Sequence, residues 1–505
     1  MLPPWEKGEL PDAPAWSWRR WYLLLGPGLL SAGAAIGGGE WLMGPVNTGR
    51  YGGSILWVTT LSILAQVVYN IEISRYTLYT GEPIMNGKFR TFMTPLFWLG
   101  IYTVLDAGSL IPYQSISTAV PIAAMAKGAV PDASTSQGTL LAIACAMYVL
   151  TAVPLVFAGK IYSFVKALMT LKVVYVFAFL TFLILFYCRW DTWVDVLTGF
   201  FKIGSVPVEG GGVKNVFVSL LSGEGLPRVD GAAVAALAAY AAIAGIGGLK
   251  NTTISSYTRE QGWGMGGQVG AISSMFGKVT LTLSHTGKVF EPTPEAMPRW
   301  RRWLRHVTRE QLAVWMTGAM IGVALPAMLS VQFLPRGQAG NDWAMAALTA
   351  GGVREAVGGA LGTLYWYMLM LCSILIFVPN TVSDADGTVR RWVDLAWTAV
   401  PRLRSWDPRK VKYLYFWTLI AYVALGVSVL LFLPRPKGLT EIYGCIANFA
   451  LGFSAFHVLC VNTRLLPPPL RPGLFTRTAL FLSGAYFMAL SGVTLMTTLR
   501  KLGWA

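Results

Sequence analysis

Charged residues are scarce in this chain of 505 residues, since Asp, Glu, Lys and Arg make up only 13% of it, against about 25% in soluble globular proteins. Histidine and cysteine are scarcer still, with three and five residues. No two cysteines form a CxxC pair, which argues against a disulfide framework and against a zinc site. Because no nucleophile motif and no cluster of His, Cys and carboxylate residues stands out, we expect no enzyme, no resident metal and no cofactor.

Apolar residues, by contrast, are abundant: 54% of the chain is hydrophobic, in long runs bounded by charge, Gly or Pro. A helix of about 20 apolar residues crosses a bilayer core of ~30 Å. The sequence therefore predicts an all-α polytopic membrane protein with about 11 transmembrane helices. The runs lie at residues 21–48, 53–79, 94–126, 138–158, 161–188, 231–258, 311–334, 357–382, 411–433, 440–463 and 473–498.

The net charge of +16 is concentrated in two loops, at 278–309 and 390–410. Basic loops favour the cytoplasmic side, so we predict a multi-pass protein of the cell (inner) membrane with a cytoplasmic N-terminus and an extracytoplasmic C-terminus. The expected partner is the lipid bilayer and not nucleic acid, and the oligomeric state stays open. The predicted parts are a cytoplasmic N-terminal segment (1–20), helices 1–5 (21–188), an irregular extracellular loop (189–230), helices 6–10 (231–465), and helix 11 with the C-terminus (466–505).

An internal repeat links the first and sixth apolar runs. Residues 32–41 read AGAAIGGGEW and residues 242–251 read AIAGIGGLKN, with the same residue at five of ten positions. Each segment begins a block of five runs. This layout is typical of a five-plus-five inverted-topology repeat, the architecture of the LeuT-type fold.

Consecutive glycines interrupt both runs in mid-membrane: Gly37, Gly38 and Gly39 in the first, Gly247 and Gly248 in the sixth. Glycine is unfavourable inside a helix, and unwound backbone at that depth is tolerated only where it lines a protein-enclosed or wet cavity. We therefore predict discontinuous first and sixth helices. Close glycine-mediated packing of intact helices is the alternative interpretation.

An ionisable residue follows each glycine group, Glu40 in the first run and Lys250 in the sixth. Such a residue inside a membrane span needs a partner. Because the two positions are equivalent in the repeat, we predict that Glu40 and Lys250 pair with each other. The pair is either a structural salt bridge or a site in which Lys250 stands where related carriers bind a cation.

Several motifs resemble the Nramp divalent-metal transporters: GPGLL at 26–30, TGE at 80–82 and LDAGSLIP at 105–112. The resemblance covers residues 21–465 and implies the LeuT-type fold and proton-coupled transport of divalent metal. The family's Asp-Pro-Gly-Asn signature falls on residues 37–40, where Gly37 and Glu40 replace both metal-binding positions. Its Met-Pro-His signature falls on residues 247–249 or 248–250, and the methionine ligand is absent in either register.

The resemblance also implies a proton pathway on the third helix, where the family has Asp-Leu-Ala-Glu. Asp106 matches the Asp of that element, whereas Ser109 replaces the Glu. Asn448 corresponds weakly to a polar position on the tenth helix, and a hydrogen bond between helices explains it equally well. Proton coupling by the family's route is therefore in question.

Coulomb's law argues against a metal at this site. A divalent ion about 5 Å from one carboxylate gains on the order of 7 kcal/mol at an effective dielectric constant near 20, and an equidistant ammonium cancels that gain. We therefore predict a substrate site without a metal, for a small zwitterionic or polar solute. The alternatives are residual Mn²⁺ or Mg²⁺ transport and a sensor or scaffold that transports nothing. The predicted substrate-binding residues are Gly37, Gly38, Gly39, Glu40, Gly247, Gly248, Leu249, Lys250 and Asn251.

Two further carboxylates, Asp384 and Asp386, lie in the segment PNTVSDADGTVRRW at 379–392. They could indicate a cation site. The neighbouring arginines favour the other interpretation, a charged helix end on the cytoplasmic side.

Overall fold

The computed structural model describes residues 2–15, 26–37, 39–131, 136–157, 161–270, 272, 283–284, 286–335, 345–432 and 439–501. Within these ranges nine helical segments are long and apolar enough to cross a membrane, and a pair bent by 50° forms a tenth if it is one span. These ten correspond to ten of the eleven predicted runs. The remaining run, 21–48, includes residues 21–25, which lie outside the described residues, and continues as two short helices.

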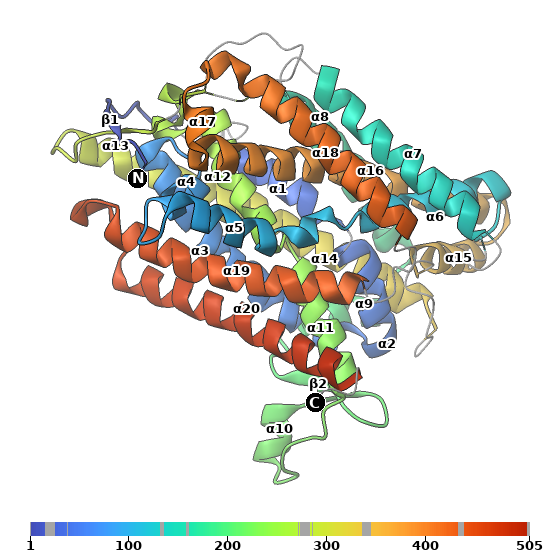
Figure 1. Ribbon diagram of the computed structural model, residues 1–505. Helices are drawn as coiled ribbons and strands as arrows, with labels where there is room; N and C mark the ends of the chain where they lie inside the picture. Colours follow the sequence, from blue (N-terminus) through green and yellow to red (C-terminus); the bar gives the residue numbers. More distant parts are fainter. Residues whose placement is uncertain are drawn as a thin grey trace.

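The first half of the chain supplies the helices of the first repeat (Figure 1). The bent span consists of α5, which Thr94 caps by accepting a hydrogen bond from the Phe97 amide, and of η4 and α6, after a bend at Asp106. The elements are α1 (Pro27–Ala35), η2 (Gly39–Met43), α2 (Gly44–Tyr51), η3 (Gly53–Ile55), α3 (Trp57–Thr80), α4 (Ile84–Phe89), α5 (Pro95–Leu105), η4 (Ala107–Leu110), α6 (Tyr113–Lys127), α7 (Gln137–Phe157) and α8 (Ile161–Tyr187).

The loop predicted as irregular at 189–230 contains regular structure. It holds α9 (Trp190–Gly199), a two-stranded antiparallel sheet of β2 (Ser205–Pro207) and β3 (Val213–Asn215), and α10 (Val216–Leu221). Asn215 starts α10 by accepting hydrogen bonds from the amides of Phe217 and Val218. The glycines in this loop hid the short elements, because they separate segments that are each too short to show a period.

The second half repeats the pattern. Asp230 caps the first of its helices by accepting hydrogen bonds from two amides of the first turn. The elements are α11 (Gly231–Ile243), η5 (Gly248–Thr252), α12 (Thr253–Glu260), η6 (Gly264–Gln268), β4 (Lys288–Val289), α13 (Ala296–Glu310), η7 (Gln311–Met316), α14 (Thr317–Phe333), α15 (Met345–Val357), α16 (Gly359–Ala399), α17 (Pro401–Arg404), η8 (Pro408–Lys410), α18 (Val411–Phe432), α19 (Leu439–Arg464), η9 (Pro468–Leu470) and α20 (Leu474–Lys501).

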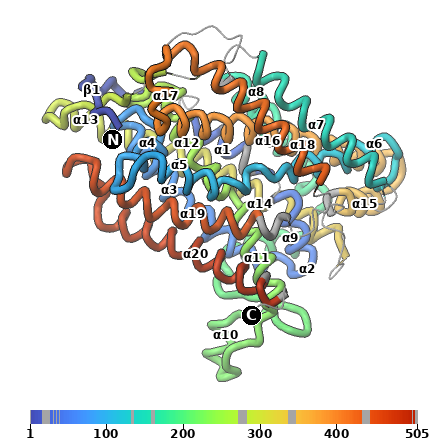
Figure 2. The backbone as a smooth tube through the Cα atoms, viewed as in Figure 1, coloured from blue at the N-terminus to red at the C-terminus, as the bar shows by residue number. Residues whose placement is uncertain are grey.

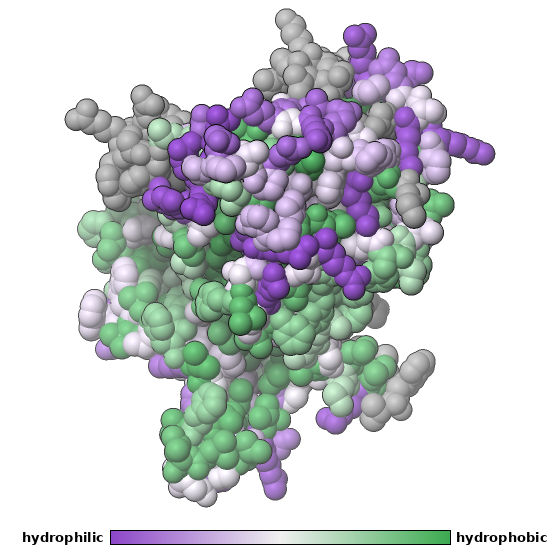
Figure 3. Space-filling view, turned by 90° about the vertical axis from the view of Figure 1, so that its left-hand side faces the viewer, coloured by the Kyte–Doolittle hydropathy of each residue, from purple (hydrophilic) through white to green (hydrophobic). Residues whose placement is uncertain are grey.

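The two ends of the chain lie at different ends of the helix bundle (Figure 1). The N-terminal strand β1 (Glu6–Lys7) pairs in parallel with β4, next to α13, whereas α20 ends beside the start of α11. Figure 3 looks onto the end that carries β1 and α13, and hydrophilic side chains gather over its upper part, with apolar side chains below.

Both broken helices are enclosed by other helices. The described part of α1 packs against α8, α14, α12 and α16, and α11 packs against α19, α20 and α3. The trace in Figure 2 shows α1 and α12 toward the N-terminal end of the bundle and α2 and α11 toward the opposite end. The two breaks therefore face each other near the middle of the fold.

Candidate functional site

The first helix break follows the C-terminus of α1. That helix ends at Ala35 and η2 begins at Gly39, and Ile36 and Gly37 between them are not helical. The break predicted at the glycines of the first run is thus confirmed, although Gly38 lies outside the described residues. The last carbonyl groups of α1 need partners other than helix amides.

The second helix break separates α11 from η5. The helix ends at Ile243 and the chain resumes helical geometry at Gly248. Gly247 has a φ of +74°, and a Cβ added there would lie 1.8 Å from the carbonyl oxygen of Ala242. Only glycine fits this position, and the discontinuity predicted for the sixth helix is confirmed, starting three residues before Gly247.

Glu40 connects the two breaks. Its side chain is 1% exposed, Oε2 accepts a hydrogen bond from the Gly37 amide at 3.0 Å, and Oε1 accepts one from the Gly245 amide at 3.0 Å. One carboxylate therefore satisfies a free backbone amide from each broken helix. These two hydrogen bonds join the first break to the second.

The predicted pairing of Glu40 with Lys250 was wrong. Lys250 Nζ lies 2.6 Å from Asp384 Oδ2 on α16, whereas the Glu40 oxygens bind backbone amides. The reason is that α16 passes the second break as an unbroken helix of 41 residues, which brings Asp384 next to η5. The interpretation of Asp384 and Asp386 as a charged helix end was wrong for the same reason, since both lie well inside α16.

Two aromatic rings flank the Lys250 ammonium. The ring centroid of Tyr113, on α6, lies 5.7 Å from Nζ, and that of Tyr443, on α19, lies 5.2 Å away. Gln114 Nε2 donates a hydrogen bond to the same Asp384 oxygen at 2.9 Å. The ion pair is thus held by residues from four parts of the fold, all nearly enclosed.

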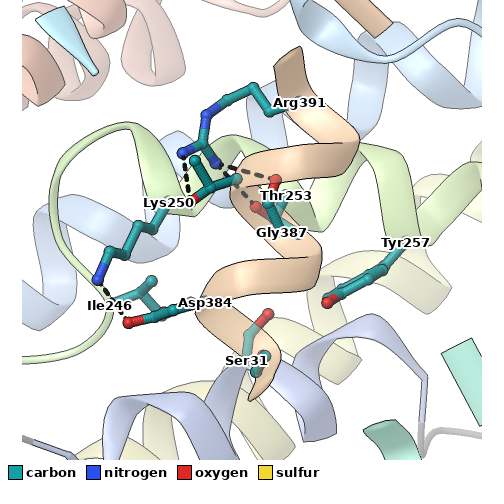
Figure 4. Close-up of a pocket in the computed structure, with 10 residues that line it drawn as sticks. Ser31, Ile246, Lys250, Thr253, Tyr257, Asp384, Gly387 and Arg391 are labelled. Atoms are coloured by element: carbon teal, nitrogen blue, oxygen red, sulfur yellow. Dashed lines mark hydrogen bonds and ion pairs between the residues drawn. The ribbon is translucent and has the colours of Figure 1, made fainter. Parts of the chain in front are cut away.

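Two small cavities meet at the ion pair, and Ile246, Lys250 and Asp384 line both. One cavity also reaches Gly37 and Glu40 at the first break. The other extends along α16 toward Arg391, with Tyr257 and Ser31 at its wall; Figure 4 shows Lys250 and Asp384 meeting tip to tip there. Their free volumes of about 10 and 20 Å³ leave space for about one water each.

Asp106 and Ser109, which the resemblance placed on a proton pathway, belong to a buried ion pair. Arg391 donates to both Asp106 oxygens at 2.8 Å, through Nε and Nη2. Ser109 Oγ donates to Oδ1 at 2.7 Å, and Trp392 Nε1 donates to Oδ2 at 2.8 Å. The described structure therefore shows a carboxylate with four donors at the bend of the third span, and a role in proton movement stays a prediction.

Gln66 on α3 is a site residue that sequence reasoning missed. Its Oε1 accepts hydrogen bonds from the amides of Ile246 and Gly247, both at 3.2 Å, and its Nε2 donates to the Ala244 carbonyl at 2.6 Å. A single neutral side chain thus satisfies most of the second break. The signal in the sequence is a polar residue inside the apolar run 53–79, which by default indicates function in a membrane span.

Leu249 and Asn251, also predicted as site residues, lie in η5 and are not among the residues that line the two cavities. Asn251 Nδ2 donates to Gln66 Oε1 at 3.1 Å and to Asn70 Oδ1 at 2.9 Å. Leu249 belongs to a hydrophobic core cluster. Asn448 donates to the Ala238 carbonyl at 3.0 Å, which is the hydrogen bond between helices that the sequence offered as one explanation.

Comparisons with known proteins agree on the fold. No protein-family model and no curated protein matches the sequence. Among solved structures, a histidine-to-alanine mutant of the Eremococcus coleocola manganese transporter matches with a TM-score of 0.63 at 12% identity, over 98% of this chain and 91% of that one. The same transporter with a bound aromatic bis-isothiourea compound matches with a TM-score of 0.59 at 11% identity, over 96% and 89%.

A second kind of transporter has the same architecture. Mhp1, a nucleobase-cation-symport-1 family transporter with bound bromovinylhydantoin, matches with a TM-score of 0.51 at 13% identity, over 94% of this chain and 93% of that one. This is the LeuT-type fold. The Nramp resemblance of the sequence is therefore supported at the level of the fold, because the manganese transporter gives the higher TM-scores of the two.

In the part of the chain that the structure describes, no group of three or more His, Cys, Asp or Glu side chains is arranged to hold a metal ion. The carboxylates near the breaks already have partners: Glu40 holds two amides, and Asp384 holds the Lys250 ammonium.

Proposed function

We propose that this chain is a secondary transporter that carries a small non-metal solute by alternating access, with its binding site at the two helix breaks. The observation that carries this proposal is the ion pair of Lys250 and Asp384, 2.6 Å apart, between the two cavities. A divalent ion at this place would meet an ammonium as close as the carboxylate, so that attraction and repulsion nearly cancel. Soft metal ligands, which transition metals prefer, are not grouped there.

The ion pair also suggests the chemistry of the solute. A zwitterion separates such a pair without leaving a buried charge unpaired, if its carboxylate binds Lys250 and its ammonium binds Asp384. The rings of Tyr113 and Tyr443 are placed to contact a cationic group of the solute as they now contact the lysine. An amino-acid-like or betaine-like solute fits these groups.

A solute needs more space than this conformation offers. Each cavity at the ion pair holds about one water, so binding requires the helices around the breaks to move apart. LeuT-type carriers move one bundle of helices against the rest around a fixed central site. We interpret the structure as a closed state in which Lys250 and Asp384 satisfy each other until a solute takes their place.

Residual divalent-metal transport is the second candidate, because the fold matches that of a manganese transporter. Isothermal titration calorimetry of the purified protein with Mn²⁺ and Mg²⁺ tests it, with a metal-transporting relative as control. We expect no saturable heat from either ion. Saturable binding would contradict the proposal and would support the metal carrier.

The solute class is tested by thermal stability in detergent with a set of amino acids and betaines, followed by uptake of the stabilising solutes into proteoliposomes. We expect stabilisation by zwitterions and loss of that response in Lys250→Met. Lys214→Met is the matched control, since Lys214 pairs with Glu224 in the exposed loop at 3.1 Å. Stabilisation and uptake that persist in Lys250→Met would overturn the zwitterion hypothesis, and a complete lack of both in the unaltered protein would favour a scaffold.

A further inference from the structure

Lys172, in the middle of α8, points its ammonium at the end of the first broken helix. Its side chain is fully buried. Nζ donates to the Gly33 carbonyl at 2.6 Å and to Asn380 Oδ1 on α16 at 2.6 Å, and it also donates to the Ile36 carbonyl. Three oxygens from two elements therefore surround one ammonium, which has three protons to donate.

The three oxygens exist because of the helix break. Gly33 and Ile36 lie at the C-terminus of α1, where carbonyl groups lack helix amides and the helix dipole is negative. Asn380 is fixed by a second contact, since its Nδ2 donates to the same Ile36 carbonyl at 3.2 Å. Its Oδ1 is therefore turned toward the ammonium. The geometry is thus a cage of three neutral oxygens around one nitrogen.

The charged groups around Lys172 act from a distance. Among the ion pairs within 4 Å that the described residues form, none includes Lys172, and its electrostatic neighbours are Glu40 on η2 and Asp384 on α16. The cage itself thus carries no formal negative charge. Carbonyl and amide oxygens without a carboxylate suit Na⁺ or an ammonium better than Mg²⁺ or Ca²⁺, which bind mainly through carboxylates.

A second buried lysine shows that burial alone does not produce such a cage. Lys88 on α4 is also fully buried, but its Nζ has one oxygen neighbour, Ser454 Oγ at 2.5 Å. The remaining contacts are the Met85 sulfur at 3.6 Å and the ring of Tyr102, whose centroid lies 4.5 Å away. Lys88 therefore provides a matched comparison for Lys172.

We propose that the ammonium of Lys172 occupies a monovalent-cation site between the C-terminus of α1 and α16. The built-in cation holds the first helix break against α16, where a free alkali ion would otherwise be needed. Half-helix C-termini and unwound carbonyls are the groups that coordinate Na⁺ in carriers of this architecture. The inference does not depend on the identity of the solute, since it concerns what holds the break together.

The test is the response of the melting temperature to Na⁺ at constant ionic strength, with choline as the replacement cation. The unaltered protein should be indifferent to Na⁺. Lys172→Ala should be less stable in choline and should regain several degrees of melting temperature with rising Na⁺, in a saturable way. If Lys172→Ala does not fold, Lys172→Ser takes its place, since it leaves similar space and adds a hydroxyl that can bind a water. We expect the same rise in its melting temperature with Na⁺.

Two controls make the result specific. Lys88→Ala should lose stability without regaining it in Na⁺, because its surroundings offer a single oxygen. Adding Asn380→Ala to Lys172→Ala should raise the Na⁺ concentration that gives half of the maximal stabilisation at least tenfold. The proposal is overturned if neither Lys172 variant responds to Na⁺, if Lys88→Ala responds equally, or if the unaltered protein already shows saturable stabilisation by Na⁺.

Discussion

Different kinds of side chain satisfy the free backbone groups at the two helix breaks. At the first break, ionisable side chains satisfy the backbone: Lys172 binds the free carbonyls and Glu40 binds the Gly37 amide. At the second break, a neutral side chain binds most of the free backbone groups, since Gln66 accepts hydrogen bonds from two amides and donates one to a carbonyl. Among the described residues, Glu40 alone donates or accepts hydrogen bonds at both breaks, since it also accepts one from the Gly245 amide.

This difference leaves the charges of the second break free for another purpose. Because Gln66 satisfies the backbone there, Lys250 is available to pair with Asp384, a side chain on the neighbouring helix. An ion pair between side chains can be exchanged for a solute's charges, whereas a charge bound to backbone is part of the structure. We therefore propose a structural role for Glu40 and Lys172 at the first break and a solute-binding role for Lys250 and Asp384 at the second.

The largest expected effect comes from breaking the ion pair of the second break on one side. Asp384→Asn leaves the Lys250 ammonium buried without its countercharge, which should lower the free energy of unfolding by about 3–5 kcal/mol. Adding Lys250→Met should recover much of that loss, because no unpaired charge remains. Thermal or chemical unfolding in detergent of the single and double variants forms a double-mutant cycle. Additive losses would show that the two residues do not interact.

Removing the neutral side chain of Gln66 from the second break should destabilise the protein nearly as much. Gln66→Leu leaves the amides of Ile246 and Gly247 and the carbonyl of Ala244 without their side-chain partner, and each such group costs about 1–3 kcal/mol. We expect a loss of at least about 2 kcal/mol, measured by unfolding. Gln66→Glu keeps the acceptor for the amides but loses the donor to the carbonyl. Its free energy of unfolding should therefore lie between that of Gln66→Leu and that of the unaltered protein. Equal stability of Gln66→Leu and the unaltered protein would mean that water replaces the side chain.

Much of the fold could be predicted from the sequence because bilayer thickness dictates the length of each apolar run. The repeat of AGAAIGGGEW and AIAGIGGLKN placed both breaks, because glycine is unfavourable inside a helix and the same glycine-rich pattern begins each block of five runs. The loop at 189–230 could not be predicted, because its helices and strands are too short to show a period. The extent of α16 was also missed, since Arg390 and Arg391 mark a helix end only when they face solvent, and both are buried in ion pairs.

The site was predicted in part, for a different reason. Glycines and nearby charges are local features, so Gly37, Glu40, Gly247 and Lys250 could be found in a single sequence. Their partners could not, because Asp384, Gln66 and Lys172 reach the breaks from three other helices. Pairing by the symmetry of the repeat led to the wrong partner for Lys250, since α16 has no break and places its carboxylate nearer than the opposite repeat does.

Backbone geometry offers a smaller test of the second break. Gly247→Ala would put a Cβ 1.8 Å from the Ala242 carbonyl oxygen at a φ of +74°, and such conformations cost about 1–3 kcal/mol in residues other than glycine. Gly231→Ala is the matched control at the start of the same span, where an added Cβ has open space within 4 Å. We expect a loss of stability only in the first variant. If both variants melt like the unaltered protein, the break does not require glycine at 247.

The smallest expected effect concerns an ion pair outside the membrane spans. Its contribution to stability can be compared with that of the Lys250–Asp384 ion pair at the second break. Glu82 follows α3 and lies 2.6 Å from Arg90. Burial alone would raise the pKa of Glu82, but the charge of Arg90 and hydrogen bonds from Arg90, Tyr76 and Trp5 hold it below its ordinary value of 4.5. A lowered pKa means that the folded state binds the proton more weakly than the unfolded state does.

Glu82 therefore stabilises the protein above the ordinary Glu pKa, and this contribution is lost as the pH falls through the lower pKa of the folded state. Glu82→Gln should cost about 1–2 kcal/mol near neutral pH, and the difference from the unaltered protein should shrink below about pH 4. The melting temperatures of both proteins across this pH range measure it. A difference that stays constant with pH would show that Glu82 acts through its hydrogen bonds to Tyr76 and Trp5 and not through its charge.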